Sequence, residues 1–322
     1  MEYRELGRTG WRVSTVGLGT WAMGSSWGPV DSRESLATLN RALDLGVNFF
    51  DTADVYGSEP LLGRLRRERS EPFYIATKMG VRLNPDPKAY NRENMTAAVD
   101  GSLHDLGVET IDLMQLHVPP IEAINAETFG ILDELVAQGK IRHYGVSVER
   151  IDQGLKAVEF PGVQSIQIIF NMFRQRPAQD FFPEARRRRV GIIARVPLAS
   201  GLLTGKMTPA TTFAANDHRN YNREGQSFDR GETFSGVDFE TGLQAVDELR
   251  ALVPPGTTMA EMALRWILMF EDVTCAIAGA KRPSQAEDNI HAADLPALPD
   301  STMEAIRAVY DRHIRTQVHQ LW

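Results

Sequence analysis

The chain has a single cysteine among its 322 residues, so no disulfide can form within it. Cys275 lies in the apolar run Val273–Ile277, where a buried structural thiol is expected. The first residues show no apolar signal core, and no stretch approaches the roughly 18 uninterrupted apolar residues of a membrane span. We therefore expect a cytoplasmic protein without a membrane partner.

The chain also has fewer positively than negatively charged residues, with 35 Lys and Arg against 42 Asp and Glu. A nucleic-acid partner would need a basic field, so none is expected. The basic block Arg186–Arg189 is interpreted as the solvated end of a helix. The seven histidines show no His-Glu-x-x-His spacing, so we predict no metal site.

The chain does contain a regular alternation of short apolar runs and longer amphipathic ones, which is typical of βα units. Near-continuous apolar strands are buried on both faces, as in a parallel sheet covered by helices. Eight such units without a Pro/Gly/Ser-rich linker favour one (β/α)8 TIM barrel over residues 1–322, with a doubly wound open sheet as the alternative. The expected strands are 15–19, 47–51, 73–78, 111–117, 141–147, 164–170, 190–196 and 274–279. The expected helices are 33–45, 59–69, 92–106, 124–138, 149–158, 177–189, 241–252, 258–270 and 284–292.

Three further segments add to this pattern. Residues 3–6 and 11–14 predict an N-terminal β-hairpin that floors the barrel, and residues 301–314 predict an extra C-terminal helix. The stretch 207–239 is rich in Asn, Asp, Gly and Thr without clear periodicity. Such a long loop is usually functional or mobile, so we expect a mobile loop that covers a ligand.

Polar residues close four consecutive expected strands, at the end of a barrel where active sites lie. Asp51 ends the second strand and leads to Tyr56, Lys78 ends the third, His117 ends the fourth and Ser147 ends the fifth. This set suits protonation of a carbonyl oxygen while a hydride reaches the carbon. We expect the Lys78 ammonium to lower the pKa of Tyr56 toward the working range, so that Tyr56 donates the proton. Asp51 would hold Lys78, and His117 would orient the carbonyl.

The residues around these positions resemble the aldo-keto reductase family, and most of all its bacterial stress-associated and inositol-operon branch. The resemblance covers essentially the whole chain. It implies an NAD(P)H-dependent carbonyl reductase on a (β/α)8 barrel, with Asp51, Tyr56, Lys78 and His117 as the catalytic tetrad. The matching motifs are Asp51, Ala53, Tyr56-Gly57, Ser58-Glu59, Leu62-Gly63, Thr77-Lys78, Asp112, Leu116-His117, Gly145-Val146-Ser147, Gln167, Asn171, 197–206, Gly279-Ala280 and Asn289.

No Gly-x-Gly-x-x-Gly motif opens a helix, since Ala22 follows Gly17 and Gly19 where the third glycine should be. A Rossmann-type site is therefore not expected, and the cofactor is placed by the resemblance. Ser147 and Gln167 would bind the nicotinamide carboxamide. The other residues implied near the ring are Gly19, Thr20, Trp21, Asp51 and Asn171.

Two positions depart from the family pattern. Val148 stands where many members have Asn, which removes one carboxamide contact. Arg195 stands where an aromatic ring commonly stacks on the nicotinamide. A guanidinium can also stack on a ring, whereas the alternative makes Arg195 the ion-pair partner of a carboxylate.

The rest of the cofactor is expected along two segments. The glycine-spaced stretch Leu198–Lys206 suits close backbone approach to a pyrophosphate, although it is not a P-loop. Its expected contacts are Pro197, Leu198, Ala199, Gly201, Leu203, Gly205 and Lys206. After the last strand, two cations precede a helix N-terminus, which favours a 2′-phosphate and hence NADPH over NADH. The contacts expected there are Gly279, Lys281, Arg282, Gln285, Asp288 and Asn289.

The substrate side is apolar and aromatic, which favours aldehydes and ketones without naming one. Its expected residues are Trp21, Met23, Trp27, Tyr90 and Val118. Two alternatives stay open. One is a cofactor-binding sensor or regulatory subunit with slow turnover, and the other is a lyase that forms a Schiff base on Lys78.

Overall fold

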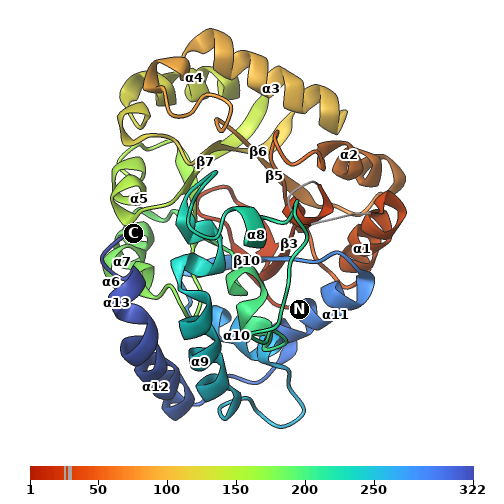
Figure 1. Cartoon of the computed structure of the whole chain (residues 1–322). Helices are drawn as coiled ribbons and strands as arrows, with labels where there is room; N and C mark the ends of the chain where they lie inside the picture. Colours follow the sequence, from red (N-terminus) through yellow and green to blue (C-terminus); the bar gives the residue numbers. More distant parts are fainter. Residues whose placement is uncertain (25–26, 28–30) are drawn as a thin grey trace.

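The structure is a computed structural model that describes residues 1–24, 27 and 31–322, and its centre is a closed parallel barrel (Figure 1). The strand order around the barrel is β10-β3-β4-β5-β6-β7-β8-β9. The barrel is confirmed, and the open-sheet alternative is wrong. The strands are β3 (Val16–Gly19), β4 (Phe49–Asp51), β5 (Tyr74–Met79), β6 (Ile111–His117), β7 (Ile141–Val148), β8 (Val163–Ile169), β9 (Gly191–Arg195) and β10 (Val273–Gly279).

Helices surround the barrel and bury an apolar face against the strands. They are α1 (Ser32–Asp44), α2 (Glu59–Glu68), α3 (Arg92–Leu106), α4 (Ala126–Ala137), α5 (Ile151–Ala157), α6 (Arg176–Asp180), α7 (Phe182–Arg188), α9 (Phe239–Arg250), α10 (Met259–Leu268), α11 (Pro283–His291), α12 (Asp300–Val309) and α13 (Arg315–Val318). Side chains of Asp31, Asn91 and Asn125 cap the starts of α1, α3 and α4 by accepting backbone N–H bonds.

Two predicted helices are interrupted. The expected helix 177–189 breaks at Phe181 into α6 and α7, because Pro183 has no N–H to donate to a preceding turn. The expected helix 301–314 ends as α12 at Val309 and continues through a π-helical turn at Tyr310–Ile314 into α13. Neither break reaches the mouth of the barrel.

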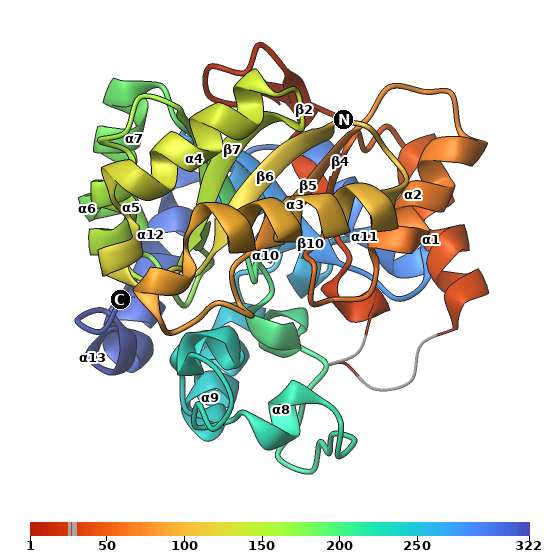
Figure 2. The same cartoon turned by 90° about the horizontal axis from the view of Figure 1, so that it is seen from above.

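The N-terminal hairpin closes one end of the barrel, as predicted (Figure 2). Its strands are β1 (Tyr3–Glu5) and β2 (Arg12–Ser14), and Leu6 and Val13 join the small apolar cluster inside the barrel. The Arg4 guanidinium donates to the carbonyl oxygens of Leu268, Phe270 and Val273. Cys275 is fully buried in the same interior cluster, as expected. The hairpin therefore covers the amino ends of the strands, and their carboxyl ends form the open end of the barrel.

The segment 207–239 lies at that open end, opposite the hairpin (Figure 2). It is not a featureless loop, because it contains α8 (His218–Tyr221) and two short 3₁₀ turns, Arg230–Glu232 and Phe234–Gly236. The Asp217 side chain caps α8 by accepting from the Arg219 amide. This local structure fixes which side chains the segment presents to the barrel mouth.

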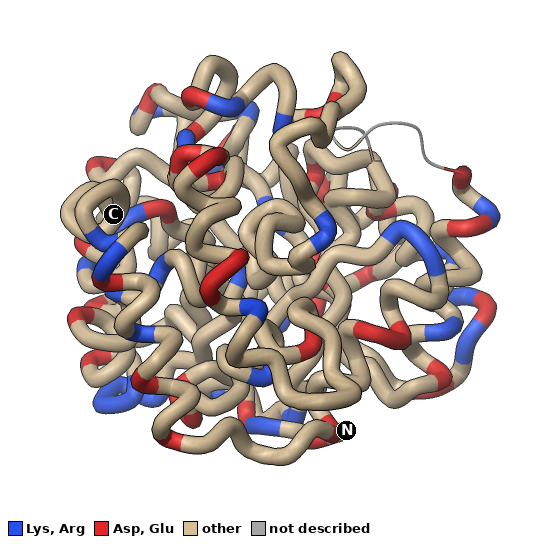
Figure 3. The backbone as a smooth tube through the Cα atoms, turned by 60° about the horizontal axis from the view of Figure 1, so that its bottom comes forward, with Lys and Arg blue, Asp and Glu red and all other residues tan. Residues whose placement is uncertain are grey.

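The surface carries mixed charges of both signs (Figure 3). The basic block at the end of α7 is exposed and ion-paired: Arg186 with Asp272, and Arg187 and Arg188 with Glu184. Its interpretation as a solvated helix end is confirmed. Within the described residues, no helix combines the length and the apolar character that crossing a membrane requires.

Candidate active site

The carboxyl ends of six neighbouring strands bring buried polar side chains into one ring. Parallel registers place Gly19 beside Asp51, His117 beside Ser147, and Ser147 beside Gln167. Side chains at the same height on neighbouring strands meet at the mouth of a barrel, so residues far apart in sequence become neighbours. The ring residues are Asp51 from β4, Lys78 from β5, His117 from β6, Ser147 from β7, Gln167 from β8 and Arg195 from β9.

Lys78 and Asp51 form a buried ion pair at the centre of this ring. Lys78 Nζ lies 2.5 Å from Asp51 Oδ1 and also donates to the Thr52 carbonyl at 2.7 Å. The Lys78 and Asp51 side chains are only 1% and 4% exposed. Burial lowers the pKa of Lys78, whereas Asp51 opposes that shift. Asp51 therefore holds Lys78, as the sequence predicts.

Tyr56 lies over this pair, and its electrostatics differ from the expectation. Lys78 Nζ lies 4.9 Å from the centroid of the Tyr56 ring. Burial and then the Asp51 charge raise the pKa of Tyr56 well above its ordinary value. The prediction of a lowered pKa is wrong for the free protein, because burial disfavours the phenolate and the Asp51 charge disfavours it further. Tyr56 is a neutral phenol, which is the form that donates a proton.

His117 lies against Tyr56 with its ring edge-to-face at a centroid distance of 5.7 Å. Burial, followed by the charges of Lys78 and Arg195, lowers the pKa of His117 well below its usual range. The imidazole is therefore neutral and can donate one hydrogen bond without carrying charge. Within the described residues its Nδ1 atom has no hydrogen-bond partner.

Two buried amides hold the other oxygen of Asp51. Gln167 Nε2 donates to Asp51 Oδ2 at 2.7 Å, and Gln115 Nε2 approaches the same oxygen at 3.4 Å. Ser147 Oγ donates to Gln167 Oε1 at 3.4 Å, so the residues expected at the carboxamide are tied to the tetrad. Sequence reasoning missed Gln115. Its signal in the sequence is a polar side chain between the apolar residues Met114 and Leu116 of β6.

A cleft of about 420 Å³ opens above the ring and extends to the start of α11. It is within the size range of small-molecule sites. The predicted residues that line it are Gly19, Trp21, Trp27, Asp51, Tyr56, His117, Ser147, Gln167, Arg195, Pro197, Leu198, Gly201, Lys206, Gly279, Lys281, Gln285, Asp288 and Asn289. Sequence reasoning missed several further lining residues, including Ser200, Met207, Arg219 and Glu232. Most of these lie in 199–239, where no periodicity indicates which side chains face inward.

Other predicted contacts lie behind the described cleft wall. The Tyr90 hydroxyl donates to Asn84 Oδ1 at 2.6 Å, and Met23 packs in the core. Asn171 Nδ2 donates to the Val196 carbonyl and Ser235 Oγ, so it braces the segment 207–239. The other predicted contacts that do not line the cleft are Thr20, Val118, Ala199, Leu203 and Gly205, together with the exposed Arg282, whose Nε lies 3.6 Å from Glu34.

The backbone that leads along the cleft after β9 is unusual. Val196, Ala199 and Ser200 have φ angles of 51°, 47° and 55°, in the left-handed region that side chains rarely adopt. Such strained backbone is found preferentially at ligand sites. Gly201, with φ of 98°, follows at the point where a side chain would approach Met207.

The segment 207–239 forms a roof on the aromatic side of the cleft. The Arg219 guanidinium lies 4.7 Å above the Trp27 ring and is held by Asp217 at 2.7 Å. The His218 ring lies 4.6 Å from Trp27 and 4.8 Å from Trp21, measured between centroids. Lys281 Nζ donates to the Trp27 carbonyl. This packing joins three chain segments above one end of the cleft.

Arg195 is held by two glutamates, so the ion-pair interpretation is confirmed. Arg195 Nη1 contacts Glu232 Oε1, and Nη2 lies 3.0 Å from Glu149 Oε2 and 2.9 Å from the Val148 carbonyl oxygen. Burial and the neighbouring Glu232 charge, opposed by Arg195, raise the pKa of Glu149 to about 7. Glu149 follows β7, whereas Glu232 belongs to the segment 207–239.

This raised pKa predicts a pH dependence of stability. An unfolded glutamate ionises near pH 4.3, so between about pH 4.3 and 7 the folded state binds more protons than the unfolded state. Stability should therefore fall across that window and then level off. Replacing Glu149 with Gln removes the dependence. In thermal melts, the Tm of Glu149→Gln should rise relative to the Tm of the wild type as the pH increases from about 5 to 7.5. Plots of Tm against pH that run parallel for the two proteins would contradict the raised pKa of Glu149.

No group of three or more His, Cys, Asp or Glu side chains in the described part of the chain could hold a metal ion. The groups that the cleft and its floor present are an ion pair, a phenol, an imidazole and amides. A neutral acid beside a neutral imidazole above a buried ion pair suits protonation of an oxygen atom.

Comparisons with known proteins agree with this geometry. The model of the Aldo/keto reductase family matches residues 15–311. The chain is 34% identical to aldo-keto reductase YhdN of Bacillus subtilis (strain 168) over 298 residues, covering 89% of this chain and 87% of that protein. It is 32% identical to L-glyceraldehyde 3-phosphate reductase of Escherichia coli O157:H7, covering 100% and 95%. The structure of glycerol dehydrogenase AKR11B4 from Gluconobacter oxydans superposes with a TM-score of 0.80 at 32% identity, covering 97% of this chain and 96% of that one.

Proposed function

Since the chain belongs to the aldo/keto reductase family and reduces carbonyl groups with a nicotinamide cofactor, we propose that Tyr56 is its proton donor. The observation that carries this proposal is the half-buried Tyr56 at one end of the cleft, grouped with the buried side chains of Lys78, Asp51 and His117. The neutral phenol provides the proton, and the neutral imidazole can orient the carbonyl oxygen by a hydrogen bond. The Lys78–Asp51 pair fixes the ammonium beneath the ring.

The residues of the cleft fit a dinucleotide cofactor. Ser147 and Gln167 offer a hydroxyl and an amide beside the tetrad, and the cleft continues along 197–206 to the start of α11. When bound, the cofactor supplies the hydride that reaches the carbonyl carbon. Tyr56 gives its proton to the carbonyl oxygen, so the product is an alcohol, and the phenolate regains a proton from solvent. Trp21 and Trp27 would exclude water from the substrate side.

We propose NADPH as the preferred cofactor. Lys281 lines the far end of the cleft, and Arg282 directly precedes α11, whose N-terminal backbone amides favour an anion. The Arg282 side chain is 70% exposed, and its Nε lies 3.6 Å from Glu34, so it can turn toward a 2′-phosphate. Charge-assisted hydrogen bonds to that phosphate would distinguish NADPH from NADH.

Titration of the purified protein with both nucleotides tests this preference. We expect Arg282→Met to weaken NADPH binding by about 10-fold or more, because a hydrogen bond to a charged group contributes about 1.5–3 kcal/mol. NADH lacks the 2′-phosphate and is the internal control, so its dissociation constant should stay unchanged. Equal weakening of both nucleotides would contradict the assignment of Arg282 to the phosphate.

The proposed substrate is a small aldehyde or ketone. Its carbonyl would lie against Tyr56 and His117, with Trp21 and Trp27 as the apolar wall. The relatives named above act on L-glyceraldehyde 3-phosphate and glycerol, as their names state. A panel of short aldehydes, including glyceraldehyde and its 3-phosphate, would identify the preferred class by the decrease in nicotinamide absorbance.

The geometry disfavours a Schiff base on Lys78. The amine is buried, paired with Asp51 and bonded to the Thr52 carbonyl, so it has no open approach for a substrate carbonyl. A nucleophilic lysine needs to lose its proton, and the adjacent carboxylate opposes that loss. A cofactor-binding protein without turnover on the aldehyde panel would instead support the sensor alternative.

A further inference from the structure

The guanidinium of Arg195 is a buried part of the cleft wall, and both of its terminal nitrogens have partners. Its Nη1 contacts Glu232, and its Nη2 contacts Glu149 and the Val148 carbonyl. These partners engage both terminal nitrogens, along the edge of the planar group. A guanidinium held in this way presents its flat face to a neighbouring ring. Arg195 lines the cleft together with both Ser147 and Tyr56.

Arg195 lies close to the reacting end of the cleft. It ends β9 and pairs in register with Ile169, the last residue of the neighbouring strand β8. Its charge contributes to the low pKa of His117, after burial and Lys78. A nicotinamide ring held by Ser147 and Gln167 would therefore lie beside this guanidinium.

The charge of the Arg195 guanidinium matters because the nicotinamide ring is neutral when reduced and cationic when oxidised. A lone buried guanidinium would repel the oxidised ring and leave the reduced ring almost unaffected. Glu149 and Glu232 supply two negative charges against the one positive charge of Arg195. The three side chains together can therefore attract the oxidised ring.

Building on the proposed function, we infer that Glu149 and Glu232 set the ratio of the affinities for oxidised and reduced cofactor. The two glutamates balance the positive charge of Arg195 next to the nicotinamide ring. They are positioning residues, because they act through Arg195 and through their own charge. Removing either charge should weaken binding of NADP⁺ more than binding of NADPH.

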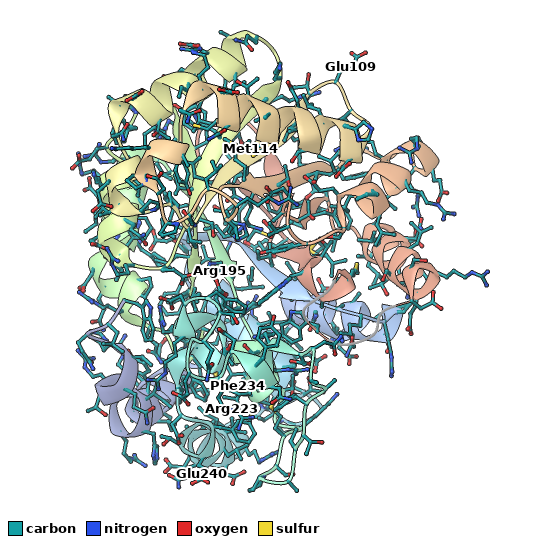
Figure 4. The ribbon with its side chains drawn as sticks, turned by 45° about the horizontal axis from the view of Figure 1, so that its top comes forward. Glu109, Met114, Arg195, Arg223, Phe234 and Glu240 are labelled. Carbon is teal, nitrogen blue, oxygen red and sulfur yellow. The ribbon has the colours of Figure 1, made fainter. Side chains whose placement is uncertain are left out.

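Glu232 is delivered to this place by the segment 207–239. Its carbonyl accepts from Ser200 Oγ at 2.9 Å, and the Phe234 amide donates to the same oxygen atom of Ser200 at 3.0 Å. Phe234 lies beside Arg223 in this segment, with the guanidinium carbon 5.8 Å from the ring centroid (Figure 4). Glu149 comes from the rigid end of β7. The position of the Glu232 carboxylate thus depends on the segment 207–239, whereas the position of the Glu149 carboxylate does not.

The test compares dissociation constants of NADP⁺ and NADPH for the wild type and for Glu232→Gln, measured by quenching of protein fluorescence. Glutamine keeps the shape and removes the charge. Measurement near pH 8 keeps Glu149, with its pKa of about 7, ionised. We expect the ratio of the NADP⁺ constant to the NADPH constant to rise about tenfold, as one partly screened charge contact permits. A tenfold rise is about 30 mV in the midpoint potential of the bound two-electron couple.

Glu149→Gln should shift the ratio in the same direction, which keeps the test decisive if Glu232→Gln does not fold. The matched control is Glu224→Gln, an exposed glutamate of the same segment, which should leave the ratio unchanged. Equal weakening of both nucleotides would show that the glutamates only hold the segment in place, and would overturn the inference. An unchanged ratio would also overturn it. A wild type that binds neither nucleotide would instead overturn the proposed function.

Discussion

Tyr56→Phe is expected to lower kcat for carbonyl reduction by about 10²–10⁴-fold, the range that a positioned general acid contributes. The change removes one oxygen atom from a ring that packs against the buried side chains of Lys78 and His117. Because the raised pKa keeps Tyr56 protonated, the loss should persist at every pH at which the wild type is active. Nucleotide titration should give a nearly unchanged dissociation constant, since the phenol acts on the substrate oxygen.

Tyr90→Phe is the matched control for this experiment. Tyr90 is buried, and its hydroxyl bonds to Asn84 and lies behind the cleft wall. The control should cost about 1 kcal/mol of stability through one lost hydrogen bond and leave kcat unchanged. Carbonyl reduction by Tyr56→Phe at the rate of the wild type would refute Tyr56 as the proton donor. A loss of activity in Tyr90→Phe would restore the sequence prediction that Tyr90 contacts substrate.

Asp51→Asn is expected to destabilise the protein by about 3–5 kcal/mol, because it leaves the buried Lys78 charge without its carboxylate. Lys78 Nζ then keeps only the Thr52 carbonyl, and Gln167 Nε2 loses its charged acceptor. Unfolding in urea, followed by circular dichroism, measures the change in the free energy of unfolding. Carbonyl reduction should fall as well, since the ammonium beneath Tyr56 is no longer held.

The double variant Asp51→Asn/Lys78→Met separates stability from catalysis. Removing both charges replaces a buried ion pair by neutral groups, which is often close to neutral for stability. The double variant should therefore recover most of the lost unfolding free energy and remain inactive. If the double variant were as unstable as Asp51→Asn, the isolated Lys78 charge would not explain the loss of stability. The ion pair itself would then stabilise the barrel.

The sequence by itself determined the architecture and the place of the chemistry. Each buried strand is a short apolar run, and each helix is a longer amphipathic one, so local periodicity indicated all eight strands to within two residues at each end. Asp51, Lys78 and His117 end consecutive strands, and the barrel geometry alone makes such residues neighbours. The hairpin floor was equally local, because its two strands are adjacent in the chain.

The electrostatics of the site were decided only by the tertiary structure. A pKa depends on burial and on every charge within a few ångströms, and those neighbours come from distant parts of the chain. Asp51 offsets the effect of Lys78 on Tyr56, and Gln115 and Gln167 reach Asp51 from 64 and 116 residues away.

Arg195 shows the same division between sequence and fold. Its position in β9 followed from the strand pattern, but its two partners did not. Glu232, 37 residues further along the chain, belongs to a segment without periodicity, and Glu149 lies beyond the end of another strand. The strand pattern therefore predicts the side chains at the strand ends of the barrel mouth, such as Asp51, His117 and Arg195. Only the folded chain brings opposite charges close enough to determine their protonation and their effect on a bound ring.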